Sequence, residues 1–128
     1  MQSYRDLIVW QKSIDLVAEV YDIVKSFPKE EIYALSSQVR RAAVSIPSNI
    51  AEGHNRNYDK EFVHFLCIAR GSLGELETQL FIAKRLNYIS EEQVNKLLTD
   101  CYEIGKMLNA LIKKVKNGSC KKQIASSK

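Results

Sequence analysis

The segment DKEFVHFLCIARGSLGELETQLFIAKRL, residues 59–86, carries the clearest structural signal in the chain. Apolar residues recur in it at alternating spacings of four and three residues, which predicts one long amphipathic helix. A repeat of 3.5 residues is typical of helices that cross at about +20°, as they do in antiparallel bundles. The apolar stripe consists of Phe62, Leu66, Ala69, Leu73, Leu76, Leu80 and Ala83.

The same alternation returns directly after this segment. Ser90, followed three residues later by Gln93, predicts a capping box at the start of a helix that ends at Gly118. Because only a few residues separate the two helices, we expect them to pack side by side. The stripe of the last helix is Val94, Leu97, Cys101, Ile104, Leu108, Leu111 and Val115.

Residues 7–26 form the first predicted helix of the chain. Asp6 is its expected N-cap, since a carboxylate can accept a hydrogen bond from a free backbone N–H. Pro28 disfavours a helical conformation for Phe27 and so ends the helix. Its predicted stripe is Trp10, Ile14, Val17, Tyr21 and Val24, widened by Leu16, Val20 and Ile23.

A second helix is expected from Pro28 to about His54, because proline suits the first turn of a helix. Pro47 lies inside this helix and removes one backbone hydrogen bond. We therefore predict a kink near Pro47, with a complete break as the alternative. The apolar stripe is Ile32, Leu35, Val39, Ala42, Ile46 and Ile50.

These patterns predict an all-α protein, an antiparallel up-down-up-down four-helix bundle over residues 1–117. Gly71 and Gly74 are expected to let helix backbones approach closely. The remaining residues, 118–128, are predicted to form a basic, disordered tail. Residues 113–128 hold six lysines and no acid, whereas residues 1–112 hold 13 basic and 15 acidic residues. The net charge of +4 therefore comes from the C-terminal end and not from the body of the bundle.

The three cysteines, at positions 67, 101 and 120, have no spacing typical of a zinc site or a disulfide framework. The N-terminal residues do not resemble a signal peptide, and no stretch approaches the roughly 20 apolar residues of a membrane span. We expect reduced thiols, no membrane association and a cytoplasmic location.

Candidate catalytic residues are few. Glu61 and His64 match one of the two Glu-x-x-His motifs of di-iron bundles, but His54, the other histidine, has no glutamate three residues earlier. Cys67 lies one turn from His64 without an evident orienting acid. There is no phosphate-binding glycine motif. We expect no catalysis, metal, cofactor or small-molecule substrate, and keep a weak enzyme built on Glu61, His64 or Cys67 as a third hypothesis.

A polar line runs along the second helix beside its apolar stripe, and a similar line marks the third. The pattern fits a solvated face, with internal pairs such as Glu52 with Arg56, or a subunit interface in which Arg41 pairs with Glu75. Both interpretations stay open. The interface candidates are Gln38, Arg41, Ser45, Asn49, Glu52, Ser72 and Glu75.

Basic residues are the candidates for contact with nucleic acid, because each neutralised phosphate releases counterions. Since the body of the bundle is slightly acidic, such a patch must be local or be built by oligomerisation. The candidates are Arg40, Arg41, Arg56, Lys60, Lys113, Lys114 and Lys116.

Several stretches together resemble one known family: DLIVWQK (6–12), QVRRAAVSIPSNIAEG (38–53), KEFVHFL (60–66) and ARGSLGELE (69–77). The chain is similar, over about residues 6–117, to the bacterial four-helix-bundle proteins encoded in ribosomal RNA intervening sequences. A similar protein is the accessory variability protein of diversity-generating retroelements.

The resemblance implies a homopentamer, and a partner that is RNA or a reverse-transcriptase-like protein. The residues that it concerns are Arg40, Arg41, Asn49, Glu52 and Gly53. Our leading hypothesis is a non-enzymatic, homo-oligomeric scaffold that binds RNA or an RNA-handling protein. The alternative is a structural protein–protein interaction module that does not bind nucleic acid.

Overall fold

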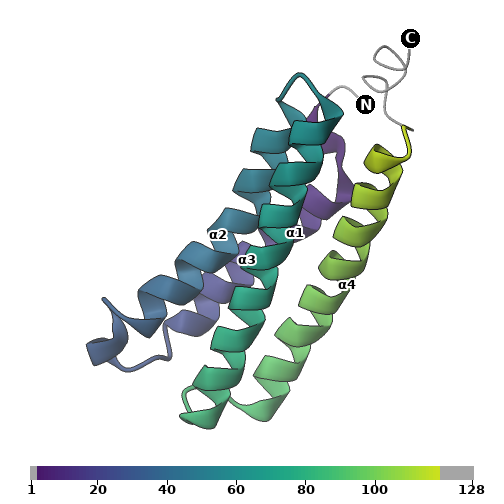
Figure 1. The fold of residues 1–128 in the computed structure, drawn as a ribbon. Coiled ribbons are helices and arrows are strands. Elements are labelled where there is room, and N and C mark those ends of the chain that lie inside the picture. The colour runs from purple at the N-terminus through teal and green to yellow at the C-terminus, as the bar shows by residue number, and fades with distance from the viewer. Residues whose placement is uncertain (1–2, 119–128) are drawn as a thin grey trace.

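The computed structural model of the protein describes residues 3–118, so most of the predicted tail lies outside the described residues (Figure 1). Four α-helices make up most of this part, and it contains no β-strand. The prediction of an all-α, four-helix protein is confirmed. The helices are α1 (Ile8–Val24), α2 (Leu35–His54), α3 (Asp59–Arg85) and α4 (Glu91–Lys116), and short 3-10 turns occupy Tyr4–Asp6 and Lys29–Glu31.

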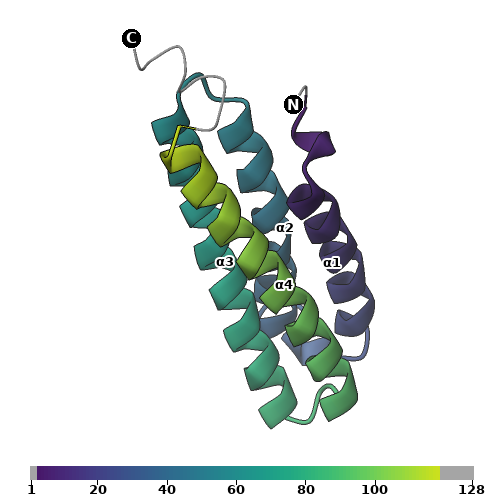
Figure 2. The ribbon, with the colours of Figure 1, turned by 90° about the vertical axis from the view of Figure 1, so that its right-hand side faces the viewer.

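The helices lie side by side around one apolar core, and the chain reverses direction at each connection (Figures 1 and 2). The contact between α2 and α3 is the most extensive, and that between α1 and α4 is the smallest among neighbouring helices. Within residues 3–118, no helix has the length and apolar character that a membrane crossing requires.

The hairpin of α3 and α4 follows its predicted pattern. Every residue of the predicted α3 stripe is buried. The capping box is confirmed, because the Gln93 N–H donates to Ser90 Oγ at 3.1 Å and the Ser90 N–H donates to Gln93 Oε1 at 3.0 Å. α3 ends in a Schellman motif, in which Asn87 has φ 64° and the Tyr88 N–H donates to the Ala83 carbonyl at 2.9 Å.

Two further predictions concern the end of α4. Gly118, with φ 75°, follows the C-cap residue Asn117, as expected of a residue that terminates the helix. One position of the stripe is wrong, however. Ile112 is buried and Leu111 is half-buried, because the step after Leu108 is four residues and not three.

The predicted core stripe of α1 is confirmed at Leu16, Val20, Ile23 and Val24, but it is wrong along its main line. Ile14 and Tyr21, placed in the core by the sequence analysis, are 41% and 46% exposed. Asp6 is not the N-cap, since Leu7 occupies that position without a side-chain cap. α1 carries two neighbouring stripes with the same spacing, and packing selects the one shifted by one residue. The buried positions are Val9, Ser13, Leu16, Val20, Ile23 and Val24.

The predicted start of α2 is also wrong. Pro28 precedes a separate 3-10 turn, and α2 begins only after Ala34, whose φ of −124° and ψ of −108° are not helical. Ile32 is consequently exposed instead of lying on the core stripe. From Leu35 onward the helix is continuous through Pro47, so the alternative of a break is wrong and the kink stays a prediction.

The glycines of α2 and α3 have different surroundings. A Cβ atom at Gly53 would lie 2.7 Å from the Phe65 Cβ, so only glycine permits the close approach of α2 to α3 there. A Cβ atom at Gly71 or Gly74 would meet nothing within 4 Å. The predicted packing role of these two glycines is therefore wrong within the chain, and both face open space.

Candidate nucleic-acid interface

Two of the predicted basic residues lie apart from the others. Arg40 and Arg41 belong to the first half of α2. Because an α-helix rises about 1.5 Å per residue, Arg41 lies on the order of 20 Å from Arg56 along the axis of α2. The guanidinium carbon of Arg40 lies 5.9 Å from the ring centroid of Tyr21, so Arg40 covers part of α1. The structure does not bring these two arginines together with the remaining candidates.

Arg56 takes part in contacts within the bundle. Its Nη2 atom lies 2.8 Å from Glu52 Oε2, which confirms the predicted pair, and its Nη1 atom lies 4.0 Å from Glu61 Oε1. Its guanidinium carbon is 4.8 Å from the ring centroid of Phe65. With two carboxylates nearby, the charge of Arg56 is largely compensated inside the chain, which makes it a weak candidate for binding phosphate.

Three predicted lysines lie where α3 and α4 meet on the outside of the bundle. Lys60 lies in the first turn of α3, and Lys113 and Lys116 lie in the last turn of α4. Between them lie two cations that the sequence analysis did not select, Arg70 and Lys106. Both are exposed.

Arg70 fixes the alignment of the two helices on this side. Its Nη1 atom donates to Asn109 Oδ1 at 2.9 Å, across the boundary between α3 and α4. Closer to the turn, Lys84 Nζ lies 3.8 Å from Glu91 Oε1. These two contacts place the exposed stripes of α3 and α4 next to each other in antiparallel order.

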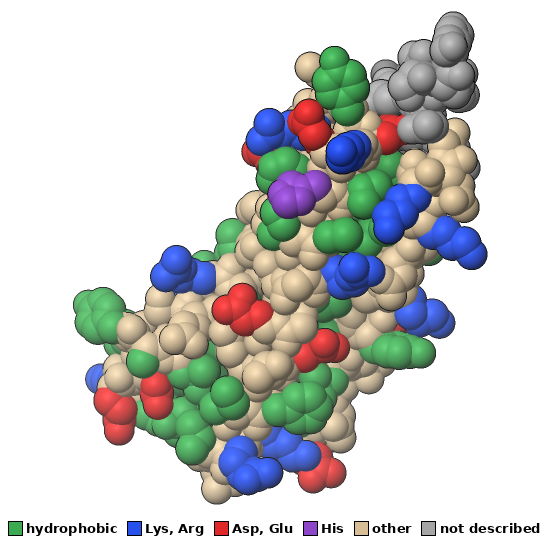
Figure 3. Space-filling view, in the orientation of Figure 1, with side chains coloured by type: hydrophobic (Ala, Val, Ile, Leu, Met, Phe, Trp, Pro, Cys, Tyr) green, Lys and Arg blue, Asp and Glu red, His purple; other side chains and the backbone are tan. Residues whose placement is uncertain are grey.

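We call this surface the cationic face. Its positions lie along one side of each helix, and its charged residues are basic, whereas the half-buried acid Glu77 lies on the same side of α3, seven residues after Arg70. Figure 3 shows basic side chains gathered over α4 and the adjoining part of α3, with apolar side chains and an acidic side chain between them. The cationic face consists of Lys60, Arg70, Gly71, Gly74, Thr78, Phe81 and Arg85 on α3, and of Thr99, Tyr102, Lys106, Asn109, Lys113 and Lys116 on α4.

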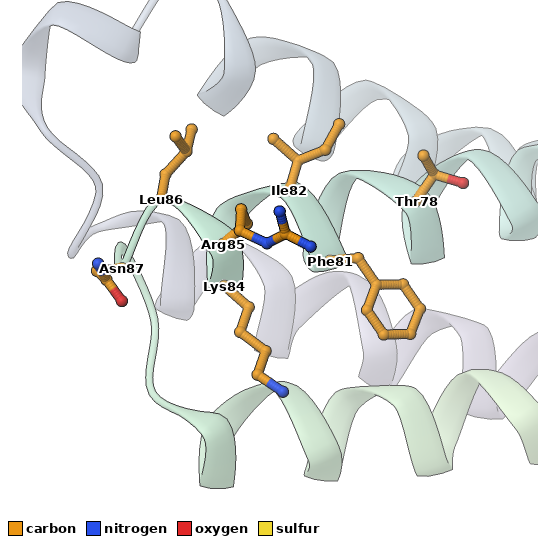
Figure 4. A pocket seen from close by; sticks show the side chains of 7 residues that line it. All are labelled: Thr78, Phe81, Ile82, Lys84, Arg85, Leu86 and Asn87. Atoms are coloured by element: carbon orange, nitrogen blue, oxygen red, sulfur yellow. The ribbon is translucent and has the colours of Figure 1, made fainter.

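Two exposed aromatic rings interrupt the basic residues of this face. Tyr102 is 66% exposed, and Lys106 Nζ lies 5.5 Å from its ring centroid. Phe81 is 55% exposed and lines a surface pocket of about 720 Å³ at the end of α3. In Figure 4, Phe81 and Lys84 point to the α4 side of this pocket, whereas Ile82 and Leu86 point to the opposite side.

The opposite flank of α4, which faces α1, has a different charge pattern. Lys96 is hydrogen-bonded to Glu19 and to Asp100, and these bonds raise the pKa of Lys96 above its ordinary value. Lys12 Nζ lies 3.7 Å from Glu103 Oε1. Lys114, predicted to bind nucleic acid, projects to this flank and not to the cationic face.

The acid nearest to the cationic face is half-buried between α3 and α4. Burial raises the pKa of Glu77. Its neighbour Cys101 is fully buried, and burial, followed by the charge of Glu77, raises the pKa of that thiol to about 12. A thiol with such a pKa stays protonated and unreactive near neutral pH.

The candidate interface residues divide into an internal and an exposed set. Ser45 Oγ and Ser72 Oγ lie 2.7 Å apart, and Asn49 Nδ2 donates to the Ser45 carbonyl at 2.8 Å, so these three tie α2 to α3. The predicted Arg41–Glu75 ion pair does not form within residues 3–118. The exposed set is Gln38, Arg41, Glu52 and Glu75.

The residues considered for catalysis do not assemble into a site in the described part of the chain. His64 is exposed and stacks edge-on against Phe65, with ring centroids 5.3 Å apart. Cys67 Sγ accepts a long contact of 3.7 Å from Arg70. Among residues 3–118, no group of three histidine, cysteine or acidic side chains is placed to hold a metal ion.

Fold and surface together define a small four-helix bundle with one cationic outer face. The chain belongs to the 23S rRNA-intervening sequence protein family, whose profile matches residues 5–110. This confirms the resemblance found in the sequence. No curated protein matches the chain.

One solved structure similar to this chain is a crystal structure of a protein with unknown function from the S23 ribosomal protein family, from Bacteroides thetaiotaomicron. The two chains are 30% identical, with a TM-score of 0.77. The match covers 83% of this chain and 96% of that one. It supports the same helical fold over almost the whole relative.

Proposed function

We propose that this protein is a non-enzymatic, homo-oligomeric scaffold that acts in the cytoplasm and binds RNA through its cationic face. The bound RNA can in turn bring in an RNA-handling partner, such as a reverse-transcriptase-like protein. The pentameric state is taken from the resemblance described above. Five copies would present the same face five times, so that avidity raises a modest affinity per chain.

The observation that carries the proposal is the gathering of six exposed cations along one side of α3 and α4, none of which forms an ion pair with a carboxylate among residues 3–118. Long-range attraction of phosphate depends on local, uncompensated charge and not on the net charge of a chain. Elsewhere on the bundle, Lys12, Lys96 and Arg56 are paired with carboxylates. The cations of the face are Lys60, Arg70, Arg85, Lys106, Lys113 and Lys116.

An apolar strip on α1 supports self-association. Trp10 and Val17 are only half-buried, and Ile14 and Tyr21 of α1 and Val44 of α2 are exposed. Apolar side chains in one continuous row on a surface commonly mark a protein contact. The same strip favours the second candidate function, a protein-interaction module without nucleic acid.

The test is fluorescence anisotropy of a structured RNA at 50 mM and 200 mM salt, using the whole chain. If about four cations per chain contact phosphates of paired segments, the affinity should fall about 150-fold between these two salt concentrations. Undetectable binding at 50 mM salt would remove the RNA proposal and leave the protein-interaction module.

The oligomeric state is tested separately, by light scattering before and after nuclease treatment. A single species of five subunits that survives nuclease supports the scaffold. A monomer contradicts it. Reversing the charge of Arg40 and Arg56 should leave RNA binding intact, because neither belongs to the cationic face.

A further inference from the structure

We propose that the cationic face selects unpaired RNA, by stacking a base on the ring of Tyr102. This inference rests on the proposed function and names the class of RNA that the face takes. It concerns a contact that attraction between opposite charges alone does not require.

The side chain of Tyr102 lies outside the core of the bundle. Its ring is 66% exposed, between Thr99 one turn before it and Lys106 one turn after it. The buried stripe of α4 passes through Cys101 and Ile104 instead. A large ring kept in water contributes little to folding, whereas its free face can stack on any nucleobase.

The α3 surface beside Tyr102 includes an open position. The Arg70–Asn109 and Lys84–Glu91 contacts set the alignment of α3 and α4, and by that alignment Tyr102 lies level with residues 74–77 of α3. A Cβ atom at Gly74 would meet nothing within 4 Å, so this position of α3 leaves open space. A glycine inside a helix is unfavourable for helix stability, and here no internal contact requires it.

One cation lies against the ring, and a second lies further along the same face. Lys106 Nζ is 5.5 Å from the ring centroid, and Arg70 is held by Asn109 one turn further along. Phe81 offers a second exposed ring on the α3 side of the same face. Aromatic rings among phosphate-binding cations are the arrangement by which proteins hold single strands.

This arrangement favours unpaired over paired RNA. In an A-form duplex the faces of the bases are stacked inside the helix, and only phosphates, 2′-hydroxyls and base edges reach a protein. A duplex can therefore use the cations but not Tyr102. An unpaired strand can use both.

The experiment measures anisotropy of two labelled RNAs with the full chain at 50 mM salt: a 20-nucleotide oligouridine and a fully paired 20-base-pair duplex. The variants are Tyr102→Leu, Tyr102→Phe and, as a matched control, Tyr33→Leu, since Tyr33 is exposed but lies outside the cationic face. Circular dichroism verifies the fold of each variant.

We expect Tyr102→Leu to weaken oligouridine binding about tenfold and duplex binding less than twofold. Tyr102→Phe and Tyr33→Leu should leave both affinities unchanged. Ultraviolet crosslinking to oligouridine should recover the peptide that contains Tyr102.

Equal losses for both RNAs, or no loss with Tyr102→Leu while salt-sensitive binding persists, overturn the stacking inference alone. If neither RNA binds the unmodified protein, the proposed function fails as well. The two failures are thus distinguishable.

Discussion

The two flanks of α4 carry lysines in opposite situations. On the flank that faces α1, Lys96 is held by Glu19 and Asp100, and Lys12 reaches across to Glu103. On the flank that faces α3, Lys106 and Lys113 form no ion pair with a carboxylate among residues 3–118. The first set of charges links two helices whose contact is the smallest among neighbouring helices. Under the proposed function the second set binds phosphate, so that pairing, and not number, would separate structural from binding lysines.

The largest expected effect comes from reversing charge on the α3 flank. Lys106→Glu combined with Lys113→Glu should weaken RNA binding about 100-fold, or by about 2.7 kcal/mol, because two phosphate contacts become repulsive. Thermal stability should stay unchanged. The control is Lys25→Glu with Lys29→Glu, which makes the same change of net charge elsewhere. Equal losses in both double variants would mean that overall charge, and not this face, governs binding.

Reversing one charge on the flank that faces α1 should lower thermal stability and leave RNA binding unchanged. Lys96→Glu places a third carboxylate beside Glu19 and Asp100, so the contact between α1 and α4 should weaken and Tm should fall by a few degrees. RNA affinity should remain within twofold. Calorimetry and anisotropy on the same sample check both statements, and an unchanged Tm would show that this ion-pair network contributes nothing to folding.

Gly74 and Gly53 allow a second comparison, between an open and a crowded position of the helix backbone. Gly74→Ala should stabilise the protein by about 0.5–1 kcal/mol, since alanine favours the helix and its Cβ meets no atom. Gly53→Ala should destabilise it by about 1–3 kcal/mol, because its Cβ would collide with Phe65. Urea unfolding measures both, and a destabilising Gly74→Ala would imply that Gly74 is covered by another subunit.

The smallest effect concerns Glu77, the half-buried acid beneath the cationic face. Its raised pKa means that the folded state favours the protonated carboxyl, so stability is lost as pH rises through that pKa. Glu77→Gln should therefore raise Tm slightly at pH 7, by about 1–2 °C, and should have no effect below pH 4. Thermal scans at both pH values decide this, and an equal shift at both would assign the effect to something other than ionisation.

The sequence predicts α3 and α4 almost residue by residue, because each has one apolar stripe and clear end signals such as Ser90 and Gly118. α1 fails because apolar residues cover more than half of its circumference, and spacing alone cannot choose between Val9 and Trp10 as the start of the core stripe. α2 fails at its start because the proline signal is local, whereas the interruption at Ala34 has no marker in the sequence.

The candidate site is harder to predict for a geometric reason. Arg70 and Lys106 are isolated charges in the sequence, and only the alignment of α3 with α4 puts them on one surface. A search for exposed residues at heptad spacing on α4 would have found Tyr102, Lys106, Asn109 and Lys113. Their counterparts on α3 depend on a tertiary contact that the sequence does not state.

The connection between α3 and α4 has a consequence for how this surface can evolve. The left-handed backbone conformation of Asn87 and the capping box at Ser90 fix the conformation of this short turn. One residue inserted within α4, just after this turn, would rotate everything beyond it by about 100° relative to α3. The core stripe of α4 and its basic side chains would then both lose their alignment with α3. Insertions or deletions that preserve the core of the bundle must therefore also preserve the alignment of the basic residues on α3 with those on α4. Selection for folding thus also keeps the cationic face assembled.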